Sequence, residues 1–132
     1  MISRQGDKIM KATETGLRRI LKAFTYSRDG FVAAFRSEAA LRQDVLFCLI
    51  CGVILCLLPV SPLERAVMAF ALIFILFAEL VNTAVEAVVD RIGAEFHPLS
   101  KKAKDIGSVL VLIAFVNMFL MWGLILWDIW GT

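Results

Sequence analysis

The sequence predicts an all-α integral membrane protein, with an N-terminal amphipathic surface helix followed by three transmembrane helices. Of its 132 residues, 60% are hydrophobic, whereas a soluble domain is nearer half apolar. The apolar residues gather in three long runs, and about 20 such residues are needed to cross a bilayer. The basic residues alternate in abundance between the segments that flank these runs, as in a multi-pass protein. No run shows the strict alternation of a strand.

The three apolar runs give the expected spans. Residues 45–60 contain no charged side chain, and Pro59 and Pro62 predict a tight connection after them. We expect one membrane domain over residues 1–132, without a cleavable signal peptide, because the N-terminus lacks an early apolar segment. Its expected elements are a short helix leading into the first span at about 31–60, a second span at about 66–90, a cytoplasmic loop at 91–105 and a third span at about 106–128.

The segment before these runs predicts an amphipathic helix at about residues 9–28. Leu17, Ile20, Leu21 and Phe24 follow the spacing of one helix face, and the basic residues occupy the other side. Such a helix lies in the membrane interface. Gly30 is expected to end it.

The distribution of Lys and Arg predicts the topology. Most of the 14 basic residues precede residue 45, and four more lie between residues 90 and 105. The first connection contains only Arg65, and the segment after the third span contains none. The positive-inside rule then places the N-terminus in the cytoplasm and the C-terminus outside.

The second span contains a polar stripe formed by Glu79, Asn82, Thr83, Glu86 and Asp90. At 100° per residue these side chains fall on one face about 100° wide, and they cover about 16 Å along the axis. Ionisable side chains inside a membrane are costly and usually functional. A purely structural stripe, hydrogen-bonded between helices, is the simpler alternative. An ion pathway or a membrane scaffold also fits, although paired acids are better explained by a divalent cation.

Other chemical signals are weak. No P-loop and no GxGxxG motif is present. Cys48 and Cys51 lie within an apolar run, where packing is the usual role. His97 has no ligand-type neighbours at the spacing of a zinc site. The basic N-terminal helix has an apolar face that favours lipid over nucleic acid. Lys104 and Asp105 adjoin the expected start of the third span, where a helix N-terminus favours a phosphate.

The segment "AELVNTAVEAVVDRIGAEFHPLSKKAKDIGS" (78–108) resembles the signature of the prokaryotic diacylglycerol kinases. The segments "LRRILKAFTYSRDG" (17–30) and "SEAALRQ" (37–43) fit the same family in order and spacing, so the similarity covers about residues 16–130. The second of these is similar to the diacylglycerol branch, because the undecaprenol kinase branch tends to have a histidine where Gln43 stands. Undecaprenol kinase is therefore the alternative. Asp44 stands where the resemblance implies a glutamate with a longer reach.

The resemblance implies an ATP- and Mg²⁺-dependent lipid kinase of the bacterial inner membrane, a homotrimer whose active sites are shared between subunits. It implies that Glu79 is the general base and that Asn82 orients groups near it. It further implies a magnesium site at Glu38 and Glu86 and a lipid site that adds Arg42 and Ser108 to Glu79. The ATP contacts that it implies are Arg19, Tyr26, Glu38, Glu86, Glu95, Phe96, His97, Lys104 and Asp105.

The order of residues along the second span agrees with this reaction. Glu79 is expected deepest in the membrane, where a lipid hydroxyl can reach it. Glu86 is about two turns nearer the cytoplasm, where ATP arrives. Direct phosphoryl transfer needs positioning and charge neutralisation more than covalent chemistry.

Overall fold

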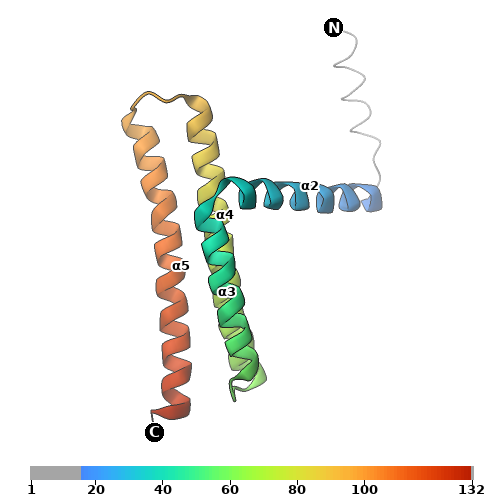
Figure 1. The fold of residues 1–132 in the computed structure, drawn as a ribbon, viewed down its shortest axis with the longest axis vertical. Helices are drawn as coiled ribbons and strands as arrows, with labels where there is room; N and C mark the ends of the chain where they lie inside the picture. Colours follow the sequence, from blue (N-terminus) through green and yellow to red (C-terminus); the bar gives the residue numbers. More distant parts are fainter. Residues whose placement is uncertain (1–15, 132) are drawn as a thin grey trace. The chain divides into compact units, whose positions relative to one another are not determined.

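A computed structural model describes residues 16–131 of the chain as helices α2 to α5 (Figure 1). The chain divides into two compact units, Met1–Arg36 and Ser37–Thr132. Helix α2 (Gly16–Ser37) makes up the described part of the first unit, and helices α3 to α5 form the second.

Helix α2 is amphipathic and has no buried residue of its own. Leu17, Ile20 and Phe24 of the predicted apolar face are all exposed, and the rings of Phe31 and Phe35 continue the apolar surface with their centroids 6.0 Å apart. The expected break at Gly30 is wrong, because the helix continues to Ser37. One glycine costs a helix only about 1 kcal/mol, which the flanking residues offset. Residues 9–15 of the predicted helix lie outside the described part of the chain.

The second unit confirms the three predicted spans. Helices α3 (Ala39–Leu57), α4 (Pro62–Ile92) and α5 (Pro98–Trp130) are each long and apolar enough to cross a membrane. Helix α4 packs against both α3 and α5, and the three run side by side in Figure 1. The predicted short helix leading into the first span from about residue 31 is not a separate element. Residues up to Ser37 belong to α2, and α3 begins at Ala39, because the backbone at Glu38 is extended and separates the two helices.

The core of the second unit lies towards the turn between α3 and α4. It joins Leu55 of α3 and Ile75 of α4 to Trp122 of α5. The indole Nε1 of Trp122 donates a buried hydrogen bond of 3.1 Å to the carbonyl of Met68. Interhelical hydrogen bonds of this kind help fix helix pairs within membranes.

The turn between α3 and α4 satisfies the backbone groups that both helix ends expose. Ser61 and Glu64 form a capping box at the start of α4, with the Glu64 carboxylate accepting from Ser61 N at 2.7 Å. The guanidinium of Arg65 donates to the carbonyls of Cys56 and Leu58 at 3.3 and 3.1 Å. The short, well-bonded turn sets the ends of the two helices level with each other.

The connection between α4 and α5 is much shorter than the predicted loop at 91–105. Helix α4 ends at Ile92 and α5 begins at Pro98. Gly93 has φ 158°, a conformation that side-chain-bearing residues rarely adopt. Pro98 occupies the first turn of α5, and the ring Nδ1 of His97 accepts from the backbone N–H of Leu99 at 3.1 Å. Because of this cap, α5 begins at Pro98, before the predicted start of the third span at about residue 106.

Helix α4 extends well past the beginning of α3. It has 31 residues and α3 has 19, and the two are level at their shared turn. The excess of 12 residues spans about 18 Å, and it lies at the end of α4 that carries Glu86 and Asp90. Glu38, just before α3, therefore comes close to the level of Glu79 and Asn82.

Candidate functional site

The polar stripe of α4 runs from a buried end to an exposed end. Glu79 is 4% exposed and Asn82 is 9% exposed, and they are the buried polar residues of the described chain. Glu86 is half-buried, and Asp90, one turn further, is exposed. Exposure of the side chains therefore increases along the stripe from Glu79 to Asp90. A carboxylic acid at the buried end can meet a group within the membrane, while the other end meets solvent.

Asn82 and Glu86 are joined directly. The amide Nδ2 of Asn82 donates to Oε1 of Glu86 at 3.3 Å, one turn along the same helix. The other end of the amide, Oδ1, is buried without a hydrogen-bond partner among the described residues, as is Oγ1 of Thr83. Through this hydrogen bond, Asn82 holds the half-buried carboxylate of Glu86 on the face of α4 that also carries the buried Glu79.

Two further acidic residues lie near the stripe, Asp44 in α3 and Glu38 just before it. The negative charges of Asp44, Glu86 and Glu38 act on Glu79. Glu38 is also fixed locally, because its Oε1 accepts from the hydroxyl of Ser37 at 2.8 Å. The proximity of Asp44 to Glu79 was not predicted from the sequence. The sequence feature that could have predicted it is the position of Asp44, an acidic residue directly before the uncharged run at residues 45–60.

Helix α5 faces the stripe with its first turns. Lys104 of α5 forms an ion pair with Asp90 of α4, and it also experiences the charge of Glu86. Asp105 pairs with Lys101 on the same helix, and the hydroxyl of Ser108 donates to the carbonyl of Lys104. The expectation that Lys104 and Asp105 adjoin a helix N-terminus is wrong, because α5 begins at Pro98. They lie about two turns into the helix instead.

The remaining predicted residues lie outside the polar stripe and the first turns of α5 that face it. Glu95, Phe96 and His97 are exposed and line a pocket of about 620 Å³ at the connection between α4 and α5. Arg42 is exposed near the start of α3. Arg19 and Tyr26 are exposed on α2, in the first unit.

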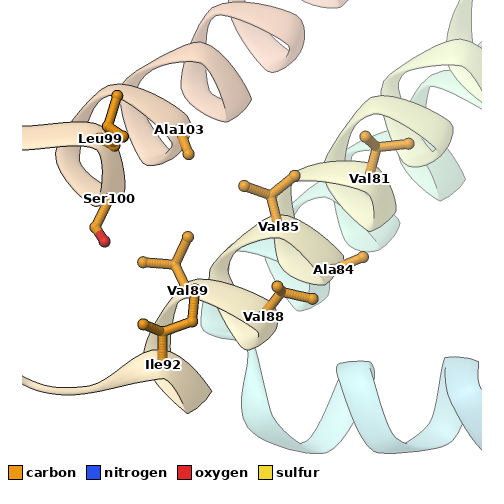
Figure 2. Close-up of a pocket in the computed structure, with 9 residues that line it drawn as sticks. All are labelled: Val81, Ala84, Val85, Val88, Val89, Ile92, Leu99, Ser100 and Ala103. Carbon is orange, nitrogen blue, oxygen red and sulfur yellow. The ribbon is translucent and has the colours of Figure 1, made fainter.

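A second pocket, of about 580 Å³, lies between α4 and α5 but contains none of the carboxylates (Figure 2). Val81, Val85 and Val88 line it from α4, and Leu99 and Ala103 line it from α5. On a helical wheel these valines fall on the side of α4 away from Glu79 and Glu86. The groove is lined by apolar side chains apart from Ser100 and contains no charged group, so the candidate site is the polar stripe.

The donor set of the stripe suits a hard cation that keeps part of its own hydration. Within residues 16–131, no three His, Cys, Asp or Glu side chains are close enough together to form a complete metal cage. Magnesium seldom uses such a cage, since it is bound through one or two carboxylates together with water and substrate phosphates. Glu86 of the stripe and Glu38, just before α3, are partly exposed to solvent, so both carboxylates are accessible to a hydrated ion.

The comparison with known proteins identifies the family of this site. Residues 25–126 match the family described as prokaryotic diacylglycerol kinase. The chain belongs to this family. The match includes all of α3, α4 and the polar stripe, together with most of α2 and α5, so the prokaryotic diacylglycerol kinase signature predicted from the sequence is confirmed.

Individual members of the prokaryotic diacylglycerol kinase family are similar over most of their length. The chain is 43% identical to the diacylglycerol kinase of Escherichia coli K12 over 122 residues, covering 92% of this chain and 100% of the relative. It is 49% identical to the diacylglycerol kinase of Pseudomonas aeruginosa over 113 residues, covering 86% and 92%. It is 40% identical to the diacylglycerol kinase of Helicobacter pylori over 108 residues, covering 82% and 84%.

Proposed function

We propose that this protein is a membrane lipid kinase that transfers the γ-phosphate of ATP to the hydroxyl of diacylglycerol, giving phosphatidic acid. Its membership of the prokaryotic diacylglycerol kinase family carries this proposal. The polar stripe supports it, because it connects a buried carboxylate to the solvent-exposed end of α4. The relatives are named diacylglycerol kinases, which disfavours undecaprenol as the substrate. Family membership likewise favours an enzyme over an ion pathway or scaffold.

Glu79 is the proposed general base. It is buried near the middle of the second unit, where the hydroxyl of a membrane lipid can approach from within the bilayer. Removing the hydroxyl proton during attack on phosphorus contributes typically 10²- to 10⁴-fold to such a reaction. Asn82, one turn away, orients the neighbouring carboxylate Glu86 through its amide.

Glu38 and Glu86 are the proposed ligands of a magnesium ion that accompanies ATP. When bound, such an ion neutralises charge on the transferring phosphoryl group. The mutual repulsion of the carboxylates around Glu79 supports this assignment, because a divalent cation would offset it.

Lys104 is the proposed partner of the ATP phosphates, acting as a point charge. It already experiences the charge of Glu86. Asp105, Arg19, Tyr26 and the 95–97 segment complete the proposed ATP contacts, and Arg42 and Ser108 line the lipid side together with Glu79.

The proposed assembly is a homotrimer with active sites shared between subunits, in the bacterial inner membrane. The distribution of basic residues supports a cytoplasmic N-terminus and a C-terminus on the outer side. The exposed basic and apolar faces of α2 support its position on the cytoplasmic surface of the membrane.

The decisive experiment measures transfer of labelled phosphate from Mg-ATP to lipid by purified protein in mixed micelles. Diacylglycerol and undecaprenol are offered separately, and Glu79→Gln serves as the variant without a base. We expect labelling of diacylglycerol, with turnover at least 100-fold lower in Glu79→Gln and an unchanged melting temperature. Near-normal turnover in that variant would remove the base assignment.

The two alternative functions predict different results. Preferential labelling of undecaprenol would assign the chain to the sister branch. If neither lipid is labelled by folded protein, and if ATP causes no thermal stabilisation, the ion-pathway or scaffold interpretation replaces the kinase.

A further inference from the structure

Helices α4 and α5 approach each other unusually closely where Gly107 meets Asn82. Gly107 is buried, and a Cβ atom built on it would overlap the side-chain Oδ1 of Asn82 and lie 3.3 Å from its Cγ. Gly123, also in α5, and Gly52, in α3, have nothing within 4 Å of the corresponding position. Of these three glycines, only Gly107 lies against a neighbouring helix, and it does so at the level of the polar stripe.

The atom of Asn82 that Gly107 approaches is also the one without a hydrogen-bond partner. Oδ1 is buried without a hydrogen-bond partner among residues 16–131, which is costly for an amide oxygen. The position of the missing Cβ is also the direction of one Cα–H bond of Gly107, so that this C–H group points at Oδ1. Weak Cα–H···O contacts of this kind recur where helices pack closely.

The orientation of the same amide decides what Asn82 does to Glu86. Nδ2 donates to Oε1 of Glu86 at 3.3 Å, and an ionised carboxylate only accepts hydrogen bonds. With the amide reversed, two oxygens would face each other. A Cβ at position 107 would push Oδ1 out of its place and so disturb the hydrogen bond at the other end of the amide.

We propose that Gly107 is a positioning residue of the phosphoryl-transfer site. It leaves the space that Asn82 needs and fixes the amide with its N–H group towards Glu86. This inference rests on the proposed kinase function, because it assigns Gly107 an effect on turnover and not on folding alone. Gly107 itself touches neither substrate in this assignment.

The test compares Gly107→Ala with Gly123→Ala, the same change in the same helix at a position with open space. We expect kcat of Gly107→Ala to fall at least about tenfold, as for other residues that orient a ligand side chain. Gly123→Ala should retain wild-type kcat. KM for diacylglycerol should change less than kcat in Gly107→Ala, because Asn82 orients Glu86 and is not among the proposed lipid contacts. It should stay unchanged in Gly123→Ala.

A second background separates positioning from a general packing defect. Asn82→Ser removes Oδ1 and with it the steric conflict, so Gly107→Ala should have no further effect on kcat or melting temperature when Asn82 is already Ser. If Gly107→Ala alone fails to fold, the double variant still tests the inference, because it should fold as Asn82→Ser does. An equal loss of kcat from Gly107→Ala in both backgrounds would overturn the inference, as would unchanged turnover of Gly107→Ala. Absence of turnover in the wild-type protein would instead reject the proposed function.

Discussion

Individual residues of the polar stripe differ in what surrounds them, and their proposed roles follow from that difference. Glu79 is almost fully buried, and the charges of Asp44, Glu86 and Glu38 act on it. Glu86 is half-buried and accepts a hydrogen bond from Asn82. Asp90 is exposed and paired with Lys104. A buried acid with acidic neighbours suits proton transfer, and partly solvated acids suit a hydrated cation.

The magnesium assignment predicts a change in the metal requirement of the kinase. Replacing Glu86 or Glu38 by Gln removes one charged oxygen ligand, so the Mg²⁺ concentration for half-maximal activity should rise at least about tenfold. A titration of phosphate transfer against Mg²⁺ at fixed ATP measures it.

Asp128→Asn is the matched control for this titration, because Asp128 is an acidic residue near the opposite end of α5. Its metal requirement should equal that of the wild type. An unchanged requirement in both Glu→Gln variants would reject these residues as ligands.

At the scale of helices, polar contacts hold α4 to α5 at two levels. The buried hydrogen bond from Trp122 to Met68 lies in the core near the α3–α4 turn, and the Lys104–Asp90 ion pair lies at the other end. The two contacts are expected to contribute unequally to stability, since exposed ion pairs contribute about 0–1 kcal/mol. The Trp122 contact is therefore expected to contribute more to the helix pair.

Trp122→Phe should accordingly destabilise the fold by about 0.5–1.5 kcal/mol, because it removes one buried hydrogen bond while keeping most of the ring. Trp127 is 72% exposed, so Trp127→Phe is the matched control and should change the unfolding free energy little. Reversible unfolding in mixed micelles measures both. Equal effects of the two substitutions would contradict the proposed importance of the Trp122 contact.

Helix α2 carries a glycine in its interior that the structure leaves without packing contacts. A Cβ at Gly30 meets nothing within 4 Å, so Gly30→Ala should stabilise α2 by about 0.5–1 kcal/mol. Amide hydrogen exchange of α2 in the full-length protein should then slow several-fold.

Gly16→Ala is the comparison for this exchange measurement. A Cβ at Gly16 would also meet nothing within 4 Å, but Gly16 is the first residue of α2, where helix propensity matters less. The exchange of the α2 amides in Gly16→Ala should therefore change little. Faster exchange in Gly30→Ala would indicate that the glycine is needed in the membrane-bound protein.

At the scale of the whole molecule, the proposed topology has a simple chemical consequence. Every lysine of the chain lies either before residue 23 or between residues 101 and 104. Both segments are predicted to be cytoplasmic, so a membrane-impermeant amine reagent should modify the protein in inside-out vesicles and not in right-side-out vesicles. Modification of lysine from the outer side would contradict the topology.

Much of this molecule is determined by sequence patterns that act locally. The apolar runs predicted the three spans because span length is set by bilayer thickness. The spacing of Glu79, Asn82 and Glu86 predicted a shared face because helix periodicity is fixed. Helix ends were predicted less well. The break at Gly30 was wrong, and α5 begins at Pro98 through a cap by His97, since glycine is tolerated within helices and capping depends on geometry.

The neighbours that one helix offers another were decided only by the tertiary structure. Asp44 beside Glu79, Lys104 paired with Asp90, and Gly107 against Asn82 each join residues from two helices. The sequence alone determined which residue types lie on each face and to which family the chain is similar. It did not determine the register and separation of the helices, because these follow from how all the side chains at an interface pack together.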